Sequence, residues 1–215
     1  MNTQEDRIDL FDSWASSYDR NLVADPGVYP FAGYDEVVAA VVATARVDLE
    51  HRVLDIGAGT GNLTAKLVDL AGEVWGTDYS ERMLLKARDK VPQACFVRWD
   101  VRESWPSQLP SQFDRIVSTY VFHEFDDVTK LRLLIELAKN RLRPGGYMVI
   151  GDIAFPNAGA QAACREDVAS AWDESEHYWV ANRIIPQLEK AGFIVGHRQI
   201  SFCGGIFVLQ LKDAT

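Results

Sequence analysis

The stretch at residues 53–62, VLDIGAGTGN, constrains the fold of this chain more than any other. An apolar run ends around Asp55, and three glycines follow at alternate positions before a helix-like segment begins. This order predicts a strand, a tight turn and a helix N-terminus, where open α/β sheets bind nucleotides. We expect Gly57 to adopt a positive φ, and Gly59 and Gly61 to leave the backbone open to a ligand.

The spacing of these glycines separates two kinds of cofactor. The dinucleotide fingerprint for a pyrophosphate is G-x-G-x-x-G, whereas residues 57–61 read G-x-G-x-G. Asp55 would repel a pyrophosphate and suits a cationic ligand. At this point the chain resembles motif I of the class I methyltransferases that depend on S-adenosylmethionine (SAM). The alternative is an ordinary glycine-rich turn.

Two more predicted strands end in an acid. The strand at 73–77 precedes Asp78, about 23 residues beyond Asp55 and close to the interval of about 20 at which a ribose-binding acid appears. The strand at 94–99 precedes Asp100. Because a buried unpaired carboxylate is costly, three acids at successive strand ends predict one shared ligand along the carboxyl edge of a sheet.

The resemblance implies a set of cofactor contacts. Asp78 would accept hydrogen bonds from the ribose hydroxyls, unless it caps the following helix, a role that Ser80 fills equally well. Asp100 would accept from the adenine amino group, and the backbone of Val101 would meet the ring. The other residues expected to contact SAM are Tyr18, Asp55, Gly57, Ala58, Gly59, Gly61, Asn62, Tyr79, Met83, Ser118 and Thr119.

The segment before the first predicted strand has aromatic residues on one helical face. Phe11, Trp14 and Tyr18 follow the i, i+3, i+7 rhythm, which is also typical of a helix simply packed on the domain. Many small-molecule methyltransferases have a similar F-x-x-x-A-x-x-Y-D opening, which covers the methionine end of SAM. The resemblance therefore implies a lid over residues 1–34, in which Tyr18 binds the ligand or substrate and Trp14 excludes water.

Residues 113–124 hold the main catalytic candidate. They match the methyltransferase pattern F-D-x-I-x-S-x-x-x-x-H, which ends at His123. His123 can be a general base, an orienting donor or a structural histidine; with Tyr18 it forms the predicted catalytic pair. The chain has neither the Asp/Asn-Pro-Pro-Tyr quartet of amino-methylating nucleic-acid enzymes nor the Pro-Cys nucleophile of cytosine-5 methylation at this position.

An acidic and aromatic segment follows at residues 155–182. By resemblance this insertion builds the acceptor pocket, so Trp172 and Tyr178 join Trp14 and His123 as predicted substrate contacts. The alternative is a solvated amphipathic helix. A pocket of acids and aromatic rings would suit a cationic or amine acceptor.

The order of the elements predicts an α/β fold of the Rossmann-like type. The resemblance implies a mixed sheet of seven strands with helices on both faces. In that sheet the last strand, 206–211, runs antiparallel between the fifth strand and the sixth, at 193–201. We expect residues 35–215 to form this SAM-binding domain behind the lid.

Composition narrows the possible partners. The net charge is −9, the pI is about 4.9, and no cluster of lysine or arginine stands out, which disfavours a nucleic-acid substrate. The three cysteines are scattered without metal-binding spacing, which predicts a reducing cytoplasm and no metal site. The polar N-terminus is not a signal peptide, and no apolar run is long enough to span a membrane.

These observations predict a SAM-dependent methyltransferase that acts on a small molecule and releases S-adenosylhomocysteine, as a monomer or homodimer. Three alternatives stay open at this point. The acceptor can be tRNA or protein, the chain can bind SAM without catalysis, or it can be a nicotinamide-dependent oxidoreductase built on the same sheet.

Overall fold

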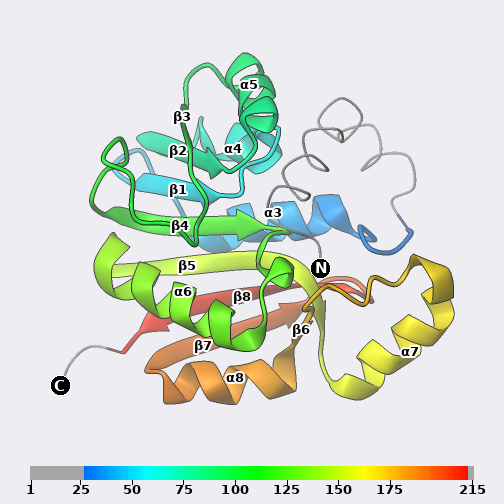
Figure 1. Cartoon of the computed structure of the whole chain (residues 1–215). Helices are drawn as coiled ribbons and strands as arrows, with labels where there is room; N and C mark the ends of the chain where they lie inside the picture. Colours follow the sequence, from blue (N-terminus) through cyan, green and yellow to red (C-terminus); the bar gives the residue numbers. More distant parts are fainter. Residues whose placement is uncertain (1–26, 213–215) are drawn as a thin grey trace.

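A central sheet organises the computed structural model, which describes residues 27–212 (Figure 1). Its strands follow the order β3-β2-β1-β4-β5-β8-β7, with β6 paired to β5 off this path. The strands are β1 (Arg52–Ile56), β2 (Glu73–Asp78), β3 (Cys95–Arg98), β4 (Phe113–Thr119), β5 (Leu142–Phe155), β6 (Trp179–Val180), β7 (Phe193–Gln199) and β8 (Gly204–Leu211). Most of the predicted lid, including Trp14 and Tyr18, lies outside the described residues.

The strand directions confirm the predicted fold. Strands β1 to β5 pair in parallel, whereas β8 runs antiparallel between β5 and β7. The strand order reverses between β1 and β4, which is the switch point where sheets of this type bind their ligands. Only β6 was not predicted, since a two-residue strand leaves no periodic pattern in the sequence.

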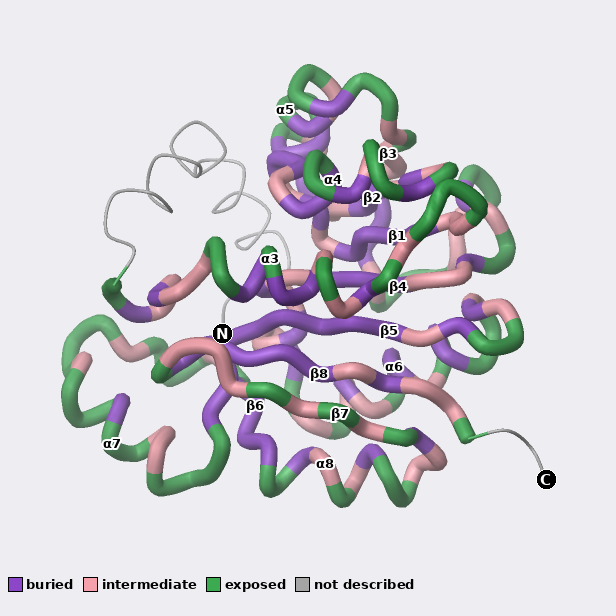
Figure 2. Tube along the Cα trace, turned by 180° about the vertical axis from the view of Figure 1, so that it is seen from behind, coloured by how far each residue is buried: buried purple, intermediate pink, exposed green. Residues whose placement is uncertain are grey.

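Helices cover both faces of the sheet. They are α3 (Tyr34–Ala45), α4 (Asn62–Leu67), α5 (Glu81–Lys90), α6 (Asp127–Arg141), α7 (Ala158–Val168) and α8 (Ala181–Lys190), with short 3₁₀ turns η1 (Phe122–Glu124) and η2 (Ala169–Ala171). One apolar cluster joins α6 and α8 to the sheet, and a second joins α3 and α4 to it. Strands β1, β4 and β5 are largely buried between these layers (Figure 2).

Two local expectations differ from the structure. The sequence predicts a helix over residues 182–191 with Pro186 inside its first turn or so, whereas the helix begins at Ala181 and Pro186 lies in its second turn. The sequence predicts a buried strand over residues 147–151, but β5 extends to Phe155, because Asp152 and Ile153 pair with β8 and the last two residues pair with β6. That extension brings Asp152 into the sheet next to the candidate site. No described helix is long and apolar enough to cross a membrane.

Candidate active site

A cleft opens at the carboxyl ends of β1, β2, β3 and β4. It brings together most of the predicted cofactor contacts, although they come from four separate strand ends and from the start of α5. The predicted residues that line it are Gly57, Gly59, Asp78, Tyr79, Met83, Asp100, Val101 and Thr119. This arrangement is the one expected when acids and glycines at successive strand ends serve one ligand.

Glycine is required at the three positions of the turn for different physical reasons. All three have positive φ, with values of 70°, 53° and 85° for Gly57, Gly59 and Gly61. A Cβ on Gly57 would stand 2.1 Å from Cγ2 of Val121, whereas a Cβ on Gly59 would meet nothing within 4 Å. A Cβ on Gly61 would press on Ala87 of α5 at 3.3 Å. Gly59 therefore opens onto the cleft, while Gly57 and Gly61 permit close packing inside the protein.

Asp78 holds the glycine turn in place. Its Oδ2 accepts a hydrogen bond from the backbone N–H of Gly59 at 3.0 Å, and its Oδ1 accepts from Ser80 N–H at 2.8 Å. Ser80 itself caps α5 by accepting from Met83 N–H, so the competing assignment of Asp78 as the cap is wrong. Asp78 lines the cleft, and its ribose contact stays a prediction.

Asp55 does not face the cleft, contrary to the expectation that it meets a positive group of the ligand. Its side chain is fully buried, and its Oδ2 accepts from Oγ1 of Thr64 in α4 at 2.6 Å. Among the described residues Oδ1 has no hydrogen-bond partner. Burial raises the pKa of Asp55 to about 7. Asp55 therefore lies in the core, where it links the end of β1 to α4 on either side of the glycine turn.

Three other predicted contacts are not among the residues that line the cleft. Ser118 donates from Oγ to the carbonyl of Ile56 at 2.7 Å. Asn62 accepts at Oδ1 from Nζ of Lys90 at 2.7 Å, and the N–H of Ala58 donates to a β2 carbonyl at 2.8 Å. Direct contact with the cofactor stays a prediction for all three.

Asp100 has a partner that the sequence analysis missed. Its Oδ1 accepts from both the backbone N–H and Nε of Arg102 at 2.9 Å, and its Oδ2 accepts from the terminal nitrogen of the same guanidinium. Although burial alone raises the pKa of Asp100, these bonds hold it below its usual range. Arg102 also lies over the ring of Phe125, 5.7 Å from its centroid. The carboxylate expected to receive the adenine is thus already engaged by Arg102.

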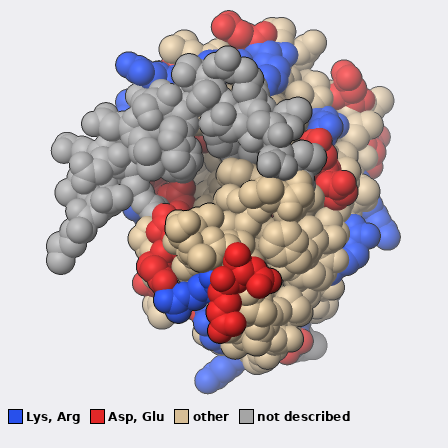
Figure 3. All heavy atoms as spheres, turned by 90° about the vertical axis from the view of Figure 1, so that its right-hand side faces the viewer, with Lys and Arg blue, Asp and Glu red and all other residues tan. Residues whose placement is uncertain are grey.

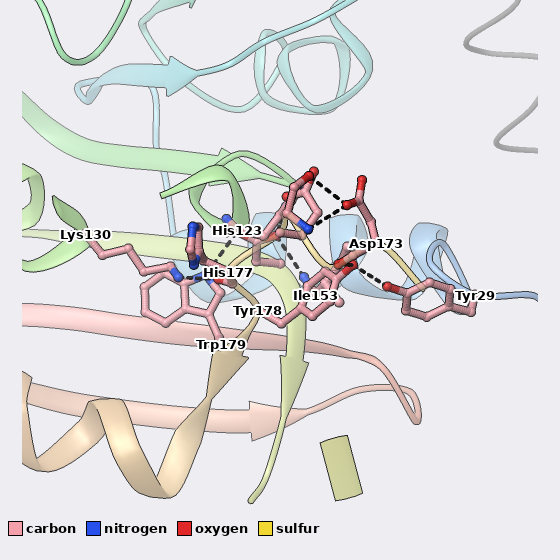
Figure 4. A network of polar contacts seen from close by, with 11 residues as sticks. Tyr29, His123, Lys130, Ile153, Asp173, His177, Tyr178 and Trp179 are labelled. Carbon is pink, nitrogen blue, oxygen red and sulfur yellow. Dashed lines mark hydrogen bonds and ion pairs between the residues drawn. The ribbon is translucent and has the colours of Figure 1, made fainter. Parts of the chain in front are cut away.

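His123 lies beside this cleft, in η1, and is almost enclosed. The ring Nδ1 is 2.6 Å from Oδ1 of Asp152, and the backbone N–H of His123 donates to Oδ2 at 2.9 Å (Figure 4). On the other side of the ring, Nε2 is 3.5 Å from Oε2 of Glu176. Only 12% of the histidine side chain is exposed. The structure therefore places His123 between two carboxylates that the sequence analysis did not single out.

The predicted substrate residues Trp172 and Tyr178 lie together in an aromatic cluster. The hydroxyl of Tyr29 donates a hydrogen bond to the hydroxyl of Tyr178 at 2.5 Å. The ring of Tyr29 stacks on the ring of Trp172, with the two ring centroids 5.6 Å apart. Trp172, Tyr178 and Glu176 also line a second cleft of about 600 Å³, built from the 155–182 segment. Within that segment α7 has Cys164 as its one buried residue, so most of its surface faces solvent as the amphipathic alternative predicts.

Comparison with known proteins identifies the family. Residues 53–146 match the family model described as a methyltransferase domain. The chain is 33% identical over 201 residues to an uncharacterized methyltransferase, GK2543, from Geobacillus kaustophilus, which covers 89% of this chain and 91% of that relative. The chain belongs to the SAM-dependent methyltransferase family.

Solved structures share the fold of this methyltransferase. The DhpI–SAM–HEP complex superposes with a TM-score of 0.74 at 16% identity, covering 97% of this chain and 98% of DhpI. The magnesium protoporphyrin IX methyltransferase ChlM from Synechocystis PCC 6803, with bound SAH, gives a TM-score of 0.68 at 20% identity over 97% and 100% of the two chains. SAM is the cofactor of this family, which agrees with the predicted cofactor.

The site fits that cofactor at its open positions. Gly59 leaves the space that a Cβ would take, and Asp78 presents a carboxylate at the end of β2. The residues that sequence reasoning missed are Arg102, Asp152 and Glu176. Arg102 carries a usable signal, since it stands two residues after a predicted cofactor acid, where it can fold back onto that acid. Asp152 and Glu176 have no such signal, because their partner is distant in sequence.

Proposed function

We propose that this methyltransferase transfers the methyl group of SAM to a small-molecule acceptor and releases S-adenosylhomocysteine. The observation that carries the proposal is the enclosure of His123. Its chain neighbours Val121 and Glu124 line the cleft at the cofactor edge of the sheet, and Glu176, 3.5 Å from its Nε2, lines the second cleft, while 12% of the His123 side chain is exposed. A small acceptor can enter such a confined site, whereas a large rigid surface cannot reach the imidazole.

Each part of the site has a separate task in this proposal. Gly59 and Asp78 would hold the adenosine part of SAM, with Tyr79, Met83 and Val101 around the base. The bound cofactor supplies the electrophilic methyl group, so the protein contributes mainly orientation and exclusion of water. Trp172 and Tyr178 would bind the acceptor. His123 and Tyr18 remain the proposed catalytic pair, although Tyr18 lies outside the described residues.

Charge supports a small acceptor over a nucleic acid. The chain carries −9, and on the face shown in Figure 3 the Lys and Arg side chains are interspersed with Asp and Glu rather than gathered in a strip. A nucleic acid needs a basic surface to neutralise its phosphates. ChlM, whose fold this chain shares, is by its name a methyltransferase of a small molecule. We further infer a cytoplasmic monomer or homodimer, consistent with three free cysteines.

Calorimetric titration of the purified full chain with SAM, S-adenosylhomocysteine and NAD tests the cofactor. We expect the first two to bind and NAD not to bind; binding of NAD alone would contradict the proposal. Incubation with SAM labelled on the methyl group then tests acceptors by class. Label transfer to small amines, alcohols or thiols supports the proposal, while transfer only to tRNA or protein would replace it. SAM binding without transfer to any class would favour a non-catalytic SAM-binding protein.

A further inference from the structure

Two carboxylates from distant parts of the chain flank the imidazole of His123. Asp152 accepts from the backbone N–H of His123 at 2.9 Å, and its other oxygen lies 2.6 Å from the ring Nδ1. Glu176 lies at the opposite nitrogen, with Oε2 3.5 Å from Nε2. Because the Asp152 carboxylate hydrogen-bonds both the main chain and the ring of His123, the ring cannot rotate without losing a hydrogen bond.

Asp152 is itself held firmly. Its Oδ1 accepts from the N–H of Ile153 at 2.8 Å, and its Oδ2 accepts from Nε1 of Trp179 at 3.0 Å. The side chain is fully buried at the end of β5. Together with the two contacts to His123, the carboxylate has four donors, which is what a buried charge requires. The orientation of the imidazole is therefore imposed by a fixed acid.

The segment that carries Glu176 is fastened to the same place. The N–H of His177 donates to the carbonyl of His123 at 2.7 Å, and the buried ammonium of Lys130 in α6 donates to the carbonyl of His177 (Figure 4). The charged groups that face the imidazole are Asp152, Glu176 and, on its own turn, Glu124. Lys130 contacts the backbone of His177, the residue after Glu176. Negative charge dominates around His123.

His123 and Glu176, called the His123–Glu176 pair below, lie close to both clefts. Val121 and Glu124, on either side of His123 in the chain, line the cleft at the cofactor edge. Glu176 lines the second cleft. The imidazole and the Glu176 carboxylate therefore stand at the boundary where an acceptor in the second cleft would approach the methyl donor.

We infer that Asp152 is a positioning residue, which fixes His123 so that its Nε2 shares one proton with Glu176 and the pair takes up the proton that the acceptor loses. The inference rests on the proposed function. As the acceptor's N–H or O–H atom bonds to the methyl carbon, the electrons of the C–S bond return to sulfur. The acceptor's proton passes to the pair, which then holds two protons and returns one to water.

The protonation of His123 agrees with this geometry. Burial alone lowers the pKa of the imidazole, but the charge and hydrogen bond of Asp152, together with Glu176, outweigh burial and raise the pKa to about 9. At neutral pH the ring is an imidazolium that donates to Asp152 through Nδ1 and lies within ion-pair distance of Glu176 through Nε2. A lone histidine acting as a free base near neutrality does not match this arrangement.

Imidazole titration by NMR tests the inference without any acceptor. The chain has four histidines, and His123→Asn assigns the signal of His123. We expect its midpoint to lie above the ordinary value of about 6.5, and to fall by about one pH unit or more in Asp152→Asn. Asp152→Glu, which keeps the charge, should restore it in part, while the matched control Asp126→Asn, at the exposed cap of α6, should leave it unchanged.

An equal midpoint in wild type and Asp152→Asn would overturn the inference, as would an equal fall in Asp126→Asn. If Asp152→Asn does not fold, Glu176→Gln decides in its place: a lowered midpoint supports the shared proton, and an unchanged one refutes it. SAM calorimetry on the same variants separates the two proposals. A wild type that does not bind SAM would contradict the proposed function, while the titration result tests only the His123–Glu176 pair and Asp152.

The pH dependence of turnover completes the test once an acceptor is found. In Asp152→Asn we expect kcat to fall and its pH limb to move with the NMR midpoint, while KM for SAM stays within about twofold, because the loss falls on the proton transfer. A KM for SAM that rises in step with the fall in kcat would show that Asp152 supports the cofactor cleft instead, which would contradict the inference.

Discussion

The cofactor cleft and the His123 network are neighbouring parts of one site, yet they are built differently. The cleft takes most of its residues from the ends of four strands, where side chains such as Asp78 and Asp100 lie at or just beyond the last strand residue. The His123 network joins η1, the far end of β5 and the 155–182 segment. Its partners are 29 residues apart for His123 and Asp152, and 47 apart for Lys130 and His177.

This difference shows which contacts the backbone alone provides. In the cleft, parallel strands deliver their ends to one edge, so the fold by itself gathers the ligand-binding residues. In the network, side chains from unrelated segments must meet with their hydrogen bonds satisfied, which only the packed structure arranges. The two parts should therefore respond differently to substitution, and four predictions test that separation.

The largest effect is expected for His123→Ala. Removing the imidazole should lower turnover by about 10²- to 10⁴-fold, the usual contribution of acid–base catalysis, while SAM affinity changes by less than about threefold. Steady-state kinetics with the identified acceptor and calorimetry with SAM measure the two quantities. Unaffected turnover would make His123 structural, and an equal loss in both quantities would erase the distinction between the two parts of the site.

Asp55→Asn tests the buried support beneath the cofactor turn. Since the pKa of Asp55 is raised to about 7, the folded protein resists its ionisation, so the wild type loses stability as pH rises from about 4 to about 7. The variant, which keeps an acceptor for Thr64, should avoid this loss and gain on the order of 4 kcal/mol relative to wild type by pH 8. Urea unfolding of both proteins at pH 4 and pH 8 measures the difference; a gap that does not grow with pH contradicts the assignment.

Asp78→Ala should affect the cofactor and spare the catalytic network. We expect SAM affinity to fall by about 10- to 100-fold, because each charge-assisted hydrogen bond contributes about 1.5–3 kcal/mol and the glycine turn loses its anchor. Calorimetry gives the affinity, and circular dichroism checks the fold. Asp78→Asn is the matched control, since it keeps one acceptor oxygen and should lose less. Unchanged affinity in Asp78→Ala would remove the ribose assignment.

The smallest effects are expected for two glycine substitutions within one turn. Both Gly57→Ala and Gly59→Ala place an L residue at positive φ, at a cost of about 1–2 kcal/mol. Only Gly57→Ala also drives a Cβ into Val121, so it should lower the free energy of unfolding further. Gly59→Ala should instead weaken SAM binding, because its Cβ stands in the open cleft. Equal effects of the two variants on stability and affinity would contradict this assignment.

Much of the fold followed from local patterns. The glycine turn, the acids at the ends of β2 and β3, the cap at Ser80 and the closing antiparallel strand all match the structure. The boundary of β5 did not, because its last residues are strand only through pairing with β8 and β6. The candidate site divides in the same way: eight predicted cofactor contacts line the cleft, whereas Asp55 and Ser118 turned out to be buried behind it.

The sequence by itself determined the family and the edge of the sheet at which the cofactor is expected, because strand ends and glycine spacing are local features of the chain. Tertiary structure alone decided that Asp152 and Glu176 flank His123, that Arg102 engages Asp100, and that the carboxylate of Asp55 points into the core. A side chain's partners and its exposure to water depend on what the fold packs against it. Those quantities set the charge of His123, and with it the chemistry proposed for the site.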